Sequence, residues 1–147
     1  MSSDSYVPPS AASAQDSFYQ ALADGDLDTL MSLWVNDDAV LCILPSGERL
    51  CGPEAIHDAL EEIFARGGVR VAYQELQSFE TGTVSVHHVI EQFQFEQAHD
   101  ISQRVFTYAT NVFLRTPYGW QLMLHHASQA GAEPDGLIAT PPSEYLH

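Results

Sequence analysis

Two pairs of adjacent histidines are the residues of this chain best suited to moving protons. His87 and His88 lie in one strand-like run of residues, and His125 and His126 lie in another. Histidine suits this chemistry because its usual pKa of about 6.5 lies close to neutral pH. Successive side chains on a strand point to opposite faces of the sheet. We therefore expect one histidine of each pair to face the interior, where it could act as a general acid or base.

His126 is the predicted inward-facing residue of the second pair. With unbroken alternation it shares a face with Trp120 and Leu122, a row that is aromatic and apolar. His125 then shares the opposite face with Gln121, which we assign to the outer side of the sheet. His126 is therefore the candidate catalytic residue. A purely structural histidine, hydrogen-bonded within the core, is the alternative.

The candidate binding site is a set of aromatic and polar side chains that could line an interior cavity. Its predicted ligand-binding residues are Tyr19, Trp34, His88, Tyr108, Asn111, Trp120 and His126. Ligand pockets have this composition, mostly apolar with a few polar groups that fix orientation. Ordinary core packing is the alternative for each aromatic residue, since buried aromatic side chains mostly pack.

A metal site would need ligands from different strands to converge on one point. His88 or Glu91 together with His126 could supply such ligands. No local spacing enforces that convergence, so we predict no metal and no other cofactor.

Three helices and six strands are predicted to position these residues. Apolar residues recur at helical spacing over 13–23, over 27–34, and over a third segment that begins at Pro53 and ends at Gly67-Gly68. Strand-like runs lie at 39–44, 48–51, 69–79, 83–96, 104–115 and 120–128. Within 69–79 the alternation changes phase at Leu76, which indicates a β-bulge or a bend.

This order of elements is typical of an α+β fold. Long strands joined by short turns form an antiparallel sheet, and such a sheet twists and curls. We expect a cone: a curved antiparallel six-stranded sheet whose concave face is covered by the three helices, which lie in the N-terminal half. The predicted boundaries are a flexible N-terminus at 1–12, one folded domain at 13–130 and a tail at 131–147.

Both alternating faces of the predicted sheet are apolar. One set contains Val84, Ile90, Phe106 and Val112, which we place inside, and the other contains Val89, Phe93, Phe95 and Phe113, which we place outside. Because a large exposed apolar face marks an interaction surface, we expect a homodimer formed through the outer face of the sheet.

The composition of the chain excludes several classes of partner. The formal net charge is −15, and the five Lys and Arg residues are all arginine. Such a field repels phosphate backbones and anionic lipids, so we expect no binding to nucleic acid or to membranes. Residues 1–12 lack the basic and apolar regions of a signal peptide, and no apolar run could span a bilayer. We therefore expect a cytoplasmic protein with Cys42 and Cys51 reduced.

Three local patterns together resemble one known superfamily. Residues 21–40 contain a helix, a break at Asp24-Gly25-Asp26 and a second helix, and residues 45–56 contain a hairpin turn and the start of a third helix. Residues 110–128 form a strand pair that ends in His-His-Ala-Ser. This combination resembles the SnoaL-like branch of the NTF2-like superfamily over residues 13–130. Its last strand pair is also similar to the association domain of calmodulin-dependent kinase II.

The resemblance implies the cone-shaped fold and three classes of function. The first is binding of a small, largely apolar molecule in the cavity, with acid or base chemistry at His126. The second is a non-catalytic dimerisation or association module. The third is an isomerase, lyase or hydrolase of the ketosteroid isomerase-like group. The catalytic Asp that such isomerases carry just before a proline is not matched, because Leu44 precedes Pro45.

Overall fold

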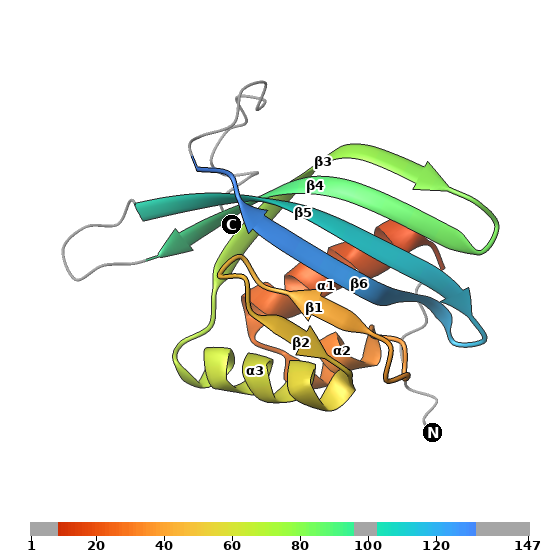
Figure 1. Cartoon of the computed structure of the whole chain (residues 1–147), viewed down its shortest axis with the longest axis horizontal. Coiled ribbons are helices and arrows are strands. Elements are labelled where there is room, and N and C mark those ends of the chain that lie inside the picture. Colours follow the sequence, from red (N-terminus) through yellow and green to blue (C-terminus); the bar gives the residue numbers. More distant parts are fainter. Residues whose placement is uncertain (1–8, 96–102, 132–147) are drawn as a thin grey trace.

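Three helices and six strands form the fold, in the predicted order (Figure 1). The computed structural model of the chain describes residues 9–95 and 103–131. The helices are α1 (Ala11–Asp24), α2 (Leu27–Ser32) and α3 (Pro53–Ala65). The strands are β1 (Leu41–Ile43), β2 (Arg49–Cys51), β3 (Arg70–Glu80), β4 (Val84–Phe95), β5 (Gln103–Thr116) and β6 (Gly119–Gln129). Residues 1–8 of the predicted flexible N-terminus (1–12) and residues 132–147 of the predicted tail (131–147) lie outside the described residues. Residues 11 and 12 belong to the first turn of α1.

The six strands make one curved sheet in the order β2-β1-β6-β5-β4-β3, and the helices lie against one side of it (Figure 1). The cone-like α+β fold is therefore confirmed, but the sheet is not wholly antiparallel. Strand β1 pairs with β6 in the parallel sense, while the other pairs are antiparallel. The prediction was wrong here because short turns indicate only how consecutive strands pair. Strand β1 pairs with β6, the last strand in the sequence, and no short turn connects the two.

The helix boundaries follow from local capping chemistry. Ser10 accepts a hydrogen bond from the Ser13 backbone N–H and begins α1. Gly25, with φ of 69°, ends α1 in the left-handed conformation. Asp26 then caps α2 through the Thr29 backbone N–H. These caps determine where α1 begins and ends and where α2 begins, and α1 supplies side chains to the site described below.

Two β-bulges decide which side chains face the interior. The predicted bulge at Leu76 is confirmed, because the pairing of β3 with β4 skips that residue. A second bulge lies at Met123: Leu122 pairs with Phe113 and Leu124 pairs with Val112, so Met123 has no partner on β5. An extra residue reverses the alternation beyond it. The buried side therefore changes from Leu122 before the bulge to His125 after it.

The inner and outer faces of β4 and β5 are the reverse of those predicted. The side chains of Val89 and Phe113 are fully buried beneath the helices, whereas Val84 and Val112 lie partly exposed on the outer face. The two alternating sets are indeed on opposite faces. Their assignment was wrong because both sets are apolar, so hydrophobicity alone does not distinguish the faces.

In the described part of the chain, no helix is both long and apolar enough to cross a bilayer.

Candidate functional site

A cavity of about 390 Å³ lies on the concave side of the sheet. Most of its wall is apolar, and Phe18, Trp34, Leu60, Ile63 and Phe93 are among the apolar lining residues. The polar residues on the wall are Cys42, Ser46, Glu91, Thr107, His125 and Gln129. This volume and composition are those of a small-molecule pocket. Leu44, at the position of the isomerase Asp, is also on the wall, so a different residue must supply any base.

His125 is the histidine that reaches this cavity. It lies on β6 just beyond the Met123 bulge, and its side chain is 8% exposed. Its Nδ1 atom lies 2.6 Å from Oδ1 of Asn111, and its ring lies 5.3 Å from the ring of Phe18. Burial lowers the pKa of His125 below its usual value, although the nearby Glu91 carboxylate opposes this shift. The imidazole is therefore neutral at physiological pH.

The contacts of Asn111 define which nitrogen of His125 carries the proton. The Asn111 amide nitrogen donates to Oε1 of Gln15 at 2.9 Å and to the Tyr19 hydroxyl at 3.1 Å. Its carbonyl oxygen therefore faces His125 and can only accept a hydrogen bond. It follows that Nδ1 of His125 carries the hydrogen and that Nε2 presents a lone pair, as a general base requires.

Glu91 supplies a second hydrogen-bond acceptor on the same wall. Its side chain is 1% exposed, and its two oxygens accept from the Tyr19 hydroxyl at 2.5 Å and from the Thr107 hydroxyl at 2.6 Å. Burial and the Glu91 charge raise the pKa of Tyr19 well above its usual value, so this hydroxyl keeps its hydrogen. Oε2 of Glu91 lies 3.8 Å from Nε2 of His125. Two acceptors thus lie close together on a mostly apolar cavity wall.

The buried His125 makes stability depend on pH in a direction that can be measured. The unfolded chain binds a proton at His125 near pH 6.5, whereas the folded protein binds it only at a lower pH. The unfolded state therefore holds more protons in this window, and the free energy of unfolding should fall as the pH drops below about 6.5. Urea unfolding at pH 7.5 and pH 5.5 measures the loss, which should be smaller in His125→Asn. Equal losses in the two proteins would contradict the assignment.

The other reactive side chain on the cavity wall, Cys42, is not a nucleophile. Burial raises the pKa of its thiol to about 12, and only the thiolate is reactive. Cys42 and Cys51 are both free thiols, as expected.

A second polar cluster lies under the sheet near β3. The Ser85 hydroxyl lies 2.8 Å from Nε2 of His87, and Nδ1 of His87 lies 2.7 Å from Oε1 of Glu75. This order of hydroxyl, imidazole and carboxylate resembles a hydrolytic triad. Ser85 is fully buried, however, and no substrate could reach its oxygen. The cluster therefore holds β3 and β4 together and is not a nucleophilic site.

Three of the predicted ligand-binding residues lie on the concave side. Trp34 forms part of the cavity wall, and Tyr19 and Asn111 make the polar contacts that hold Glu91 and His125. Trp120 is buried near the β5–β6 turn and does not line the cavity. Tyr19, Trp34 and Asn111 are therefore the part of the predicted site that the fold brings together.

The other three predicted residues lie on the outer face. His126 is exposed, and its partner on β5 is Thr110. Thr110 pairs in turn with His88 on β4. Tyr108 stacks on His88, with ring centroids 5.6 Å apart. The predicted orientation of His126 was wrong because the Met123 bulge reverses the alternation on which it depended. His126 and Glu91 are on opposite sides of the sheet, so they cannot share a metal ion.

Sequence reasoning missed His125, Thr107 and Gln15 as site residues, and it considered Glu91 only as a metal ligand. One available signal was the run Leu122-Met123-Leu124, since three successive apolar residues break a strict alternation. The second available signal was that Glu91 on one strand and Thr107 on the next are polar residues within apolar strands. The two residues pair with each other in the sheet. Gln15 carried no signal, because a glutamine on a helix is usually exposed.

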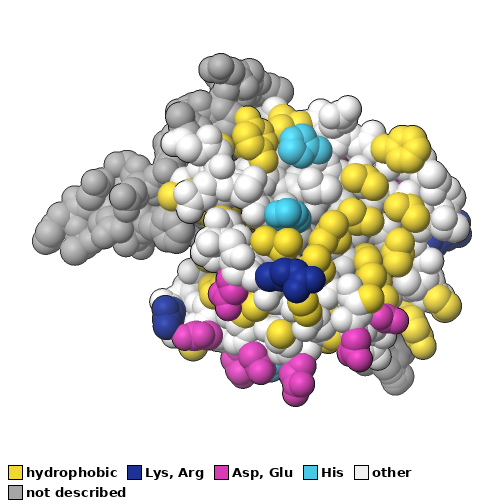
Figure 2. Space-filling view, in the orientation of Figure 1, with side chains coloured by type: hydrophobic (Ala, Val, Ile, Leu, Met, Phe, Trp, Pro, Cys, Tyr) yellow, Lys and Arg dark blue, Asp and Glu magenta, His cyan; other side chains and the backbone are white. Residues whose placement is uncertain are grey.

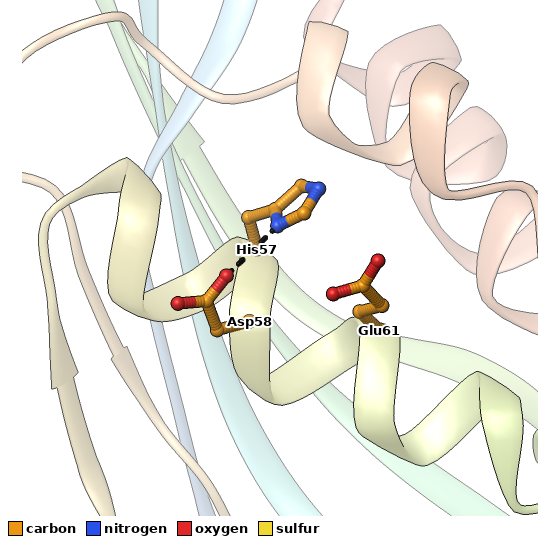
Figure 3. A group of neighbouring side chains, drawn as sticks. All are labelled: His57, Asp58 and Glu61. Atoms are coloured by element: carbon orange, nitrogen blue, oxygen red, sulfur yellow. Dashed lines mark hydrogen bonds and ion pairs between the residues drawn. The ribbon is translucent and has the colours of Figure 1, made fainter.

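One group of side chains in the described residues has metal-ligand spacing, and it lies on α3 (Figure 3). One ligand atom each from His57, Asp58 and Glu61 lie within 4.8 Å of one another, and Nδ1 of His57 contacts the Asp58 carboxylate at 3.1 Å. Both carboxylates are exposed. Exposed acidic groups often cluster in this way without an ion, so we assign no role to the group.

The sequence matches the model of the SnoaL-like domain over residues 12–132. The chain belongs to the SnoaL-like domain family. A search of curated proteins finds no match.

Solved structures similar to this SnoaL-like chain differ widely in what they are named for. A candidate calcium/calmodulin-dependent protein kinase II association domain from Thiobacillus denitrificans is 30% identical, with 84% of this chain and 98% of that one covered and a TM-score of 0.75. A candidate dehydratase of the NTF2-like family from Streptomyces avermitilis is also 30% identical, with 81% and 93% covered and a TM-score of 0.70. A ketosteroid isomerase-like protein from Erwinia carotovora, 11% identical, with 90% and 100% covered and a TM-score of 0.67, shares the fold.

Proposed function

We propose that this SnoaL-like protein binds a small, largely apolar molecule in the cavity and that His125 acts on it as a general base. The observation that carries the proposal is the pair of acceptors, Nε2 of His125 and Oε2 of Glu91, 3.8 Å apart on an apolar wall. A buried carboxylate and a neutral imidazole recognise a hydroxyl or another hydrogen-bond donor. The catalytic role first considered for His126 passes to His125 because only His125 is on the cavity wall.

The same wall selects against anionic ligands. Its polar groups are the acceptors Glu91 and His125, the thiol of Cys42, two hydroxyls and the amide of Gln129. Among the lining residues that the structure describes, none is Lys or Arg, and the whole chain carries a charge of −15. A ligand carboxylate or phosphate would be buried beside Glu91 without a cation, which is strongly unfavourable. The ligand is therefore a neutral or cationic molecule.

The reaction class that suits this arrangement is proton transfer, as in isomerisation or elimination of water. Nε2 of His125 would take the proton, while Glu91, held by Tyr19 and Thr107, orients the polar end of the ligand. The relative from Streptomyces avermitilis is named as a candidate dehydratase. In the elimination of water from a neutral β-hydroxy ketone, the base takes the acidic C–H proton and the electrons of that bond form the C=C bond. The protonated His125 can then return the proton to the departing hydroxyl, which leaves as water. This parallel supports the reaction class.

Three matched compounds test the binding part of the proposal. 2-Naphthol offers a hydroxyl donor, 2-methoxynaphthalene is similar in shape without a donor, and 2-naphthoate is an anion. We expect 2-naphthol to displace the neutral dye Nile red at concentrations about tenfold lower than 2-methoxynaphthalene, since a hydrogen bond to a charged group contributes about 1.5–3 kcal/mol. The anion should not displace the dye. Equal affinities for the three compounds would refute a donor-selective cavity.

A specific observation also favours self-association through the outer face of the sheet. One apolar row crosses five strands there, because successive pairings align Phe79, Val86, Val112, Leu124 and Leu41. Phe79 is 67% exposed, and the other four are partly exposed. Figure 2 views this face and shows hydrophobic side chains gathered over the sheet. The candidate kinase association domain from Thiobacillus denitrificans supports the same use.

A charge placed in the middle of this row should prevent association. We expect the unmodified chain to be a homodimer and Val112→Glu to be a monomer, because a carboxylate cannot be buried unpaired in an apolar interface. Size-exclusion chromatography with light scattering measures the mass, and far-UV circular dichroism checks that the variant is folded. Glu61→Ala on α3 is the control and should remain dimeric. A monomeric unmodified chain at micromolar concentration would exclude this interface.

A further inference from the structure

A line of hydrogen bonds joins the cavity to a carboxylate on β3. Nε2 of Gln15 donates to Oε1 of Glu75 at 3.0 Å, and Oε1 of Gln15 accepts from the Asn111 amide at 2.9 Å. Asn111 in turn faces Nδ1 of His125 through its carbonyl oxygen, at 2.6 Å. Gln15 and Asn111 are fully buried, whereas the Glu75 side chain is 39% exposed. The line therefore runs from the protein surface to the cavity base.

Each bond in this line fixes the orientation of the next group. An ionised carboxylate only accepts hydrogen bonds, so Glu75 requires Gln15 to turn its NH₂ group toward it. The carbonyl oxygen of Gln15 then faces Asn111 and requires the NH₂ group of that residue. The carbonyl oxygen of Asn111 is left for His125, so the hydrogen must be on Nδ1. Nε2 is consequently left as the acceptor that the cavity needs.

We infer that Glu75 is a positioning residue that, through Gln15 and Asn111, fixes the tautomer of His125 in which Nε2 is the base. This inference rests on the proposed function only in calling Nε2 a base. The assignment of the tautomer itself depends on the hydrogen bonds alone. The sequence offered no hint of the connection, since Gln15, Glu75 and Asn111 lie far apart in the chain.

The surroundings of Glu75 keep it an acceptor. Burial by itself would raise the pKa of this carboxyl, but its contacts with His87, Gln15 and Ser78 outweigh burial and hold the pKa below its usual value. At the other end, the Tyr19 hydroxyl already donates to Glu91 and accepts from the Asn111 amide. Asn111 is thus held from two directions, and loss of Glu75 alone should loosen its orientation without reversing it completely.

Nitrogen-15 NMR of the histidine side chains in the full-length, ligand-free chain at pH 7.5 tests the inference. We expect one His125 tautomer in the unmodified protein, with Nδ1 protonated and Nε2 far downfield. In Glu75→Gln, the new amide accepts either orientation of Gln15, so both tautomers should be populated and the two nitrogen shifts should move toward each other. Gln15→Leu should have the same effect, because it interrupts the line.

The matched control is Glu80→Gln, which removes the same charge from the same strand. Glu80 accepts from the Ser85 hydroxyl at 3.2 Å and is connected to Glu75 only indirectly, through Ser85 and His87. Glu80→Gln retains the Glu75 carboxylate that orients Gln15, so the His125 shifts should stay unchanged. The inference is overturned if Glu75→Gln leaves a single Nδ1–H tautomer, if Gln15→Leu fails to reproduce its effect, or if Glu80→Gln changes the shifts equally. Since the measurement needs no ligand, its failure would leave the binding proposal standing. Failure of the naphthalene series would likewise leave the tautomer result intact.

Discussion

Replacing His125 with asparagine is expected to slow proton abstraction from a bound apolar ketone by about 10²–10⁴-fold, the usual contribution of a positioned general base. The asparagine amide can still donate to Oδ1 of Asn111 in place of Nδ1, so the variant removes Nε2 and little else. Exchange of the acidic C–H protons of 2-tetralone in D₂O, followed by NMR, measures the rate. Because burial lowers the pKa of His125, activity should persist to a pH below the usual histidine value.

The control for this prediction is the adjacent histidine. His126 is exposed on the outer face, so His126→Asn should leave the exchange rate unchanged within about twofold. If both variants slowed exchange equally, or if neither did, His125 would not be the base. Retention of Nile red binding by His125→Asn would show that the cavity itself is intact.

Replacing Phe113 with alanine is expected to destabilise the fold by about 3–5 kcal/mol. Phe113 is fully buried on β5, and its ring packs edge-on against His87 at 5.6 Å. It pairs with Leu122, next to the Met123 bulge. This loss is a large part of the total stability of a typical domain, about 5–15 kcal/mol. Urea unfolding monitored by circular dichroism measures it.

Tyr118→Ala provides the matched comparison for Phe113→Ala. Tyr118 is an aromatic residue of the same β5–β6 hairpin, but it is 72% exposed, so its loss should change the free energy of unfolding by less than about 0.5 kcal/mol. A small effect of Phe113→Ala would mean that Phe113 faces outward, as we had placed it from the sequence. The pair of variants therefore tests which face of β5 is the interior.

Local chemistry made much of the fold predictable. Three helix ends were predictable from residue type and are confirmed: the left-handed glycine at Gly25, the cap at Asp26 and the proline that begins α3. The bulge at Leu76 was predictable as well, because this apolar residue breaks the alternation of apolar and polar residues that precedes it. A polar residue at this position would have left the alternation intact. These features depend on a few neighbouring residues, which the sequence displays directly.

The candidate site was less predictable because it depends on which face of the sheet is covered. Because a single residue, Met123, is unpaired in the sheet, His125 faces the interior and His126 faces outward, the reverse of the prediction. Glu91 is buried although a carboxylate normally remains exposed, and it is accommodated only because Tyr19 and Thr107 donate to it. Such partners come from distant segments, so no local pattern announces them.

A crystal structure of the protein with 2-naphthol tests the central claim most directly. We expect the naphthalene ring to lie within the cavity and its hydroxyl to lie within hydrogen-bond distance of Oε2 of Glu91 or Nε2 of His125. A ligand on the outer face of the sheet, or one within the cavity whose hydroxyl points away from both atoms, would contradict it.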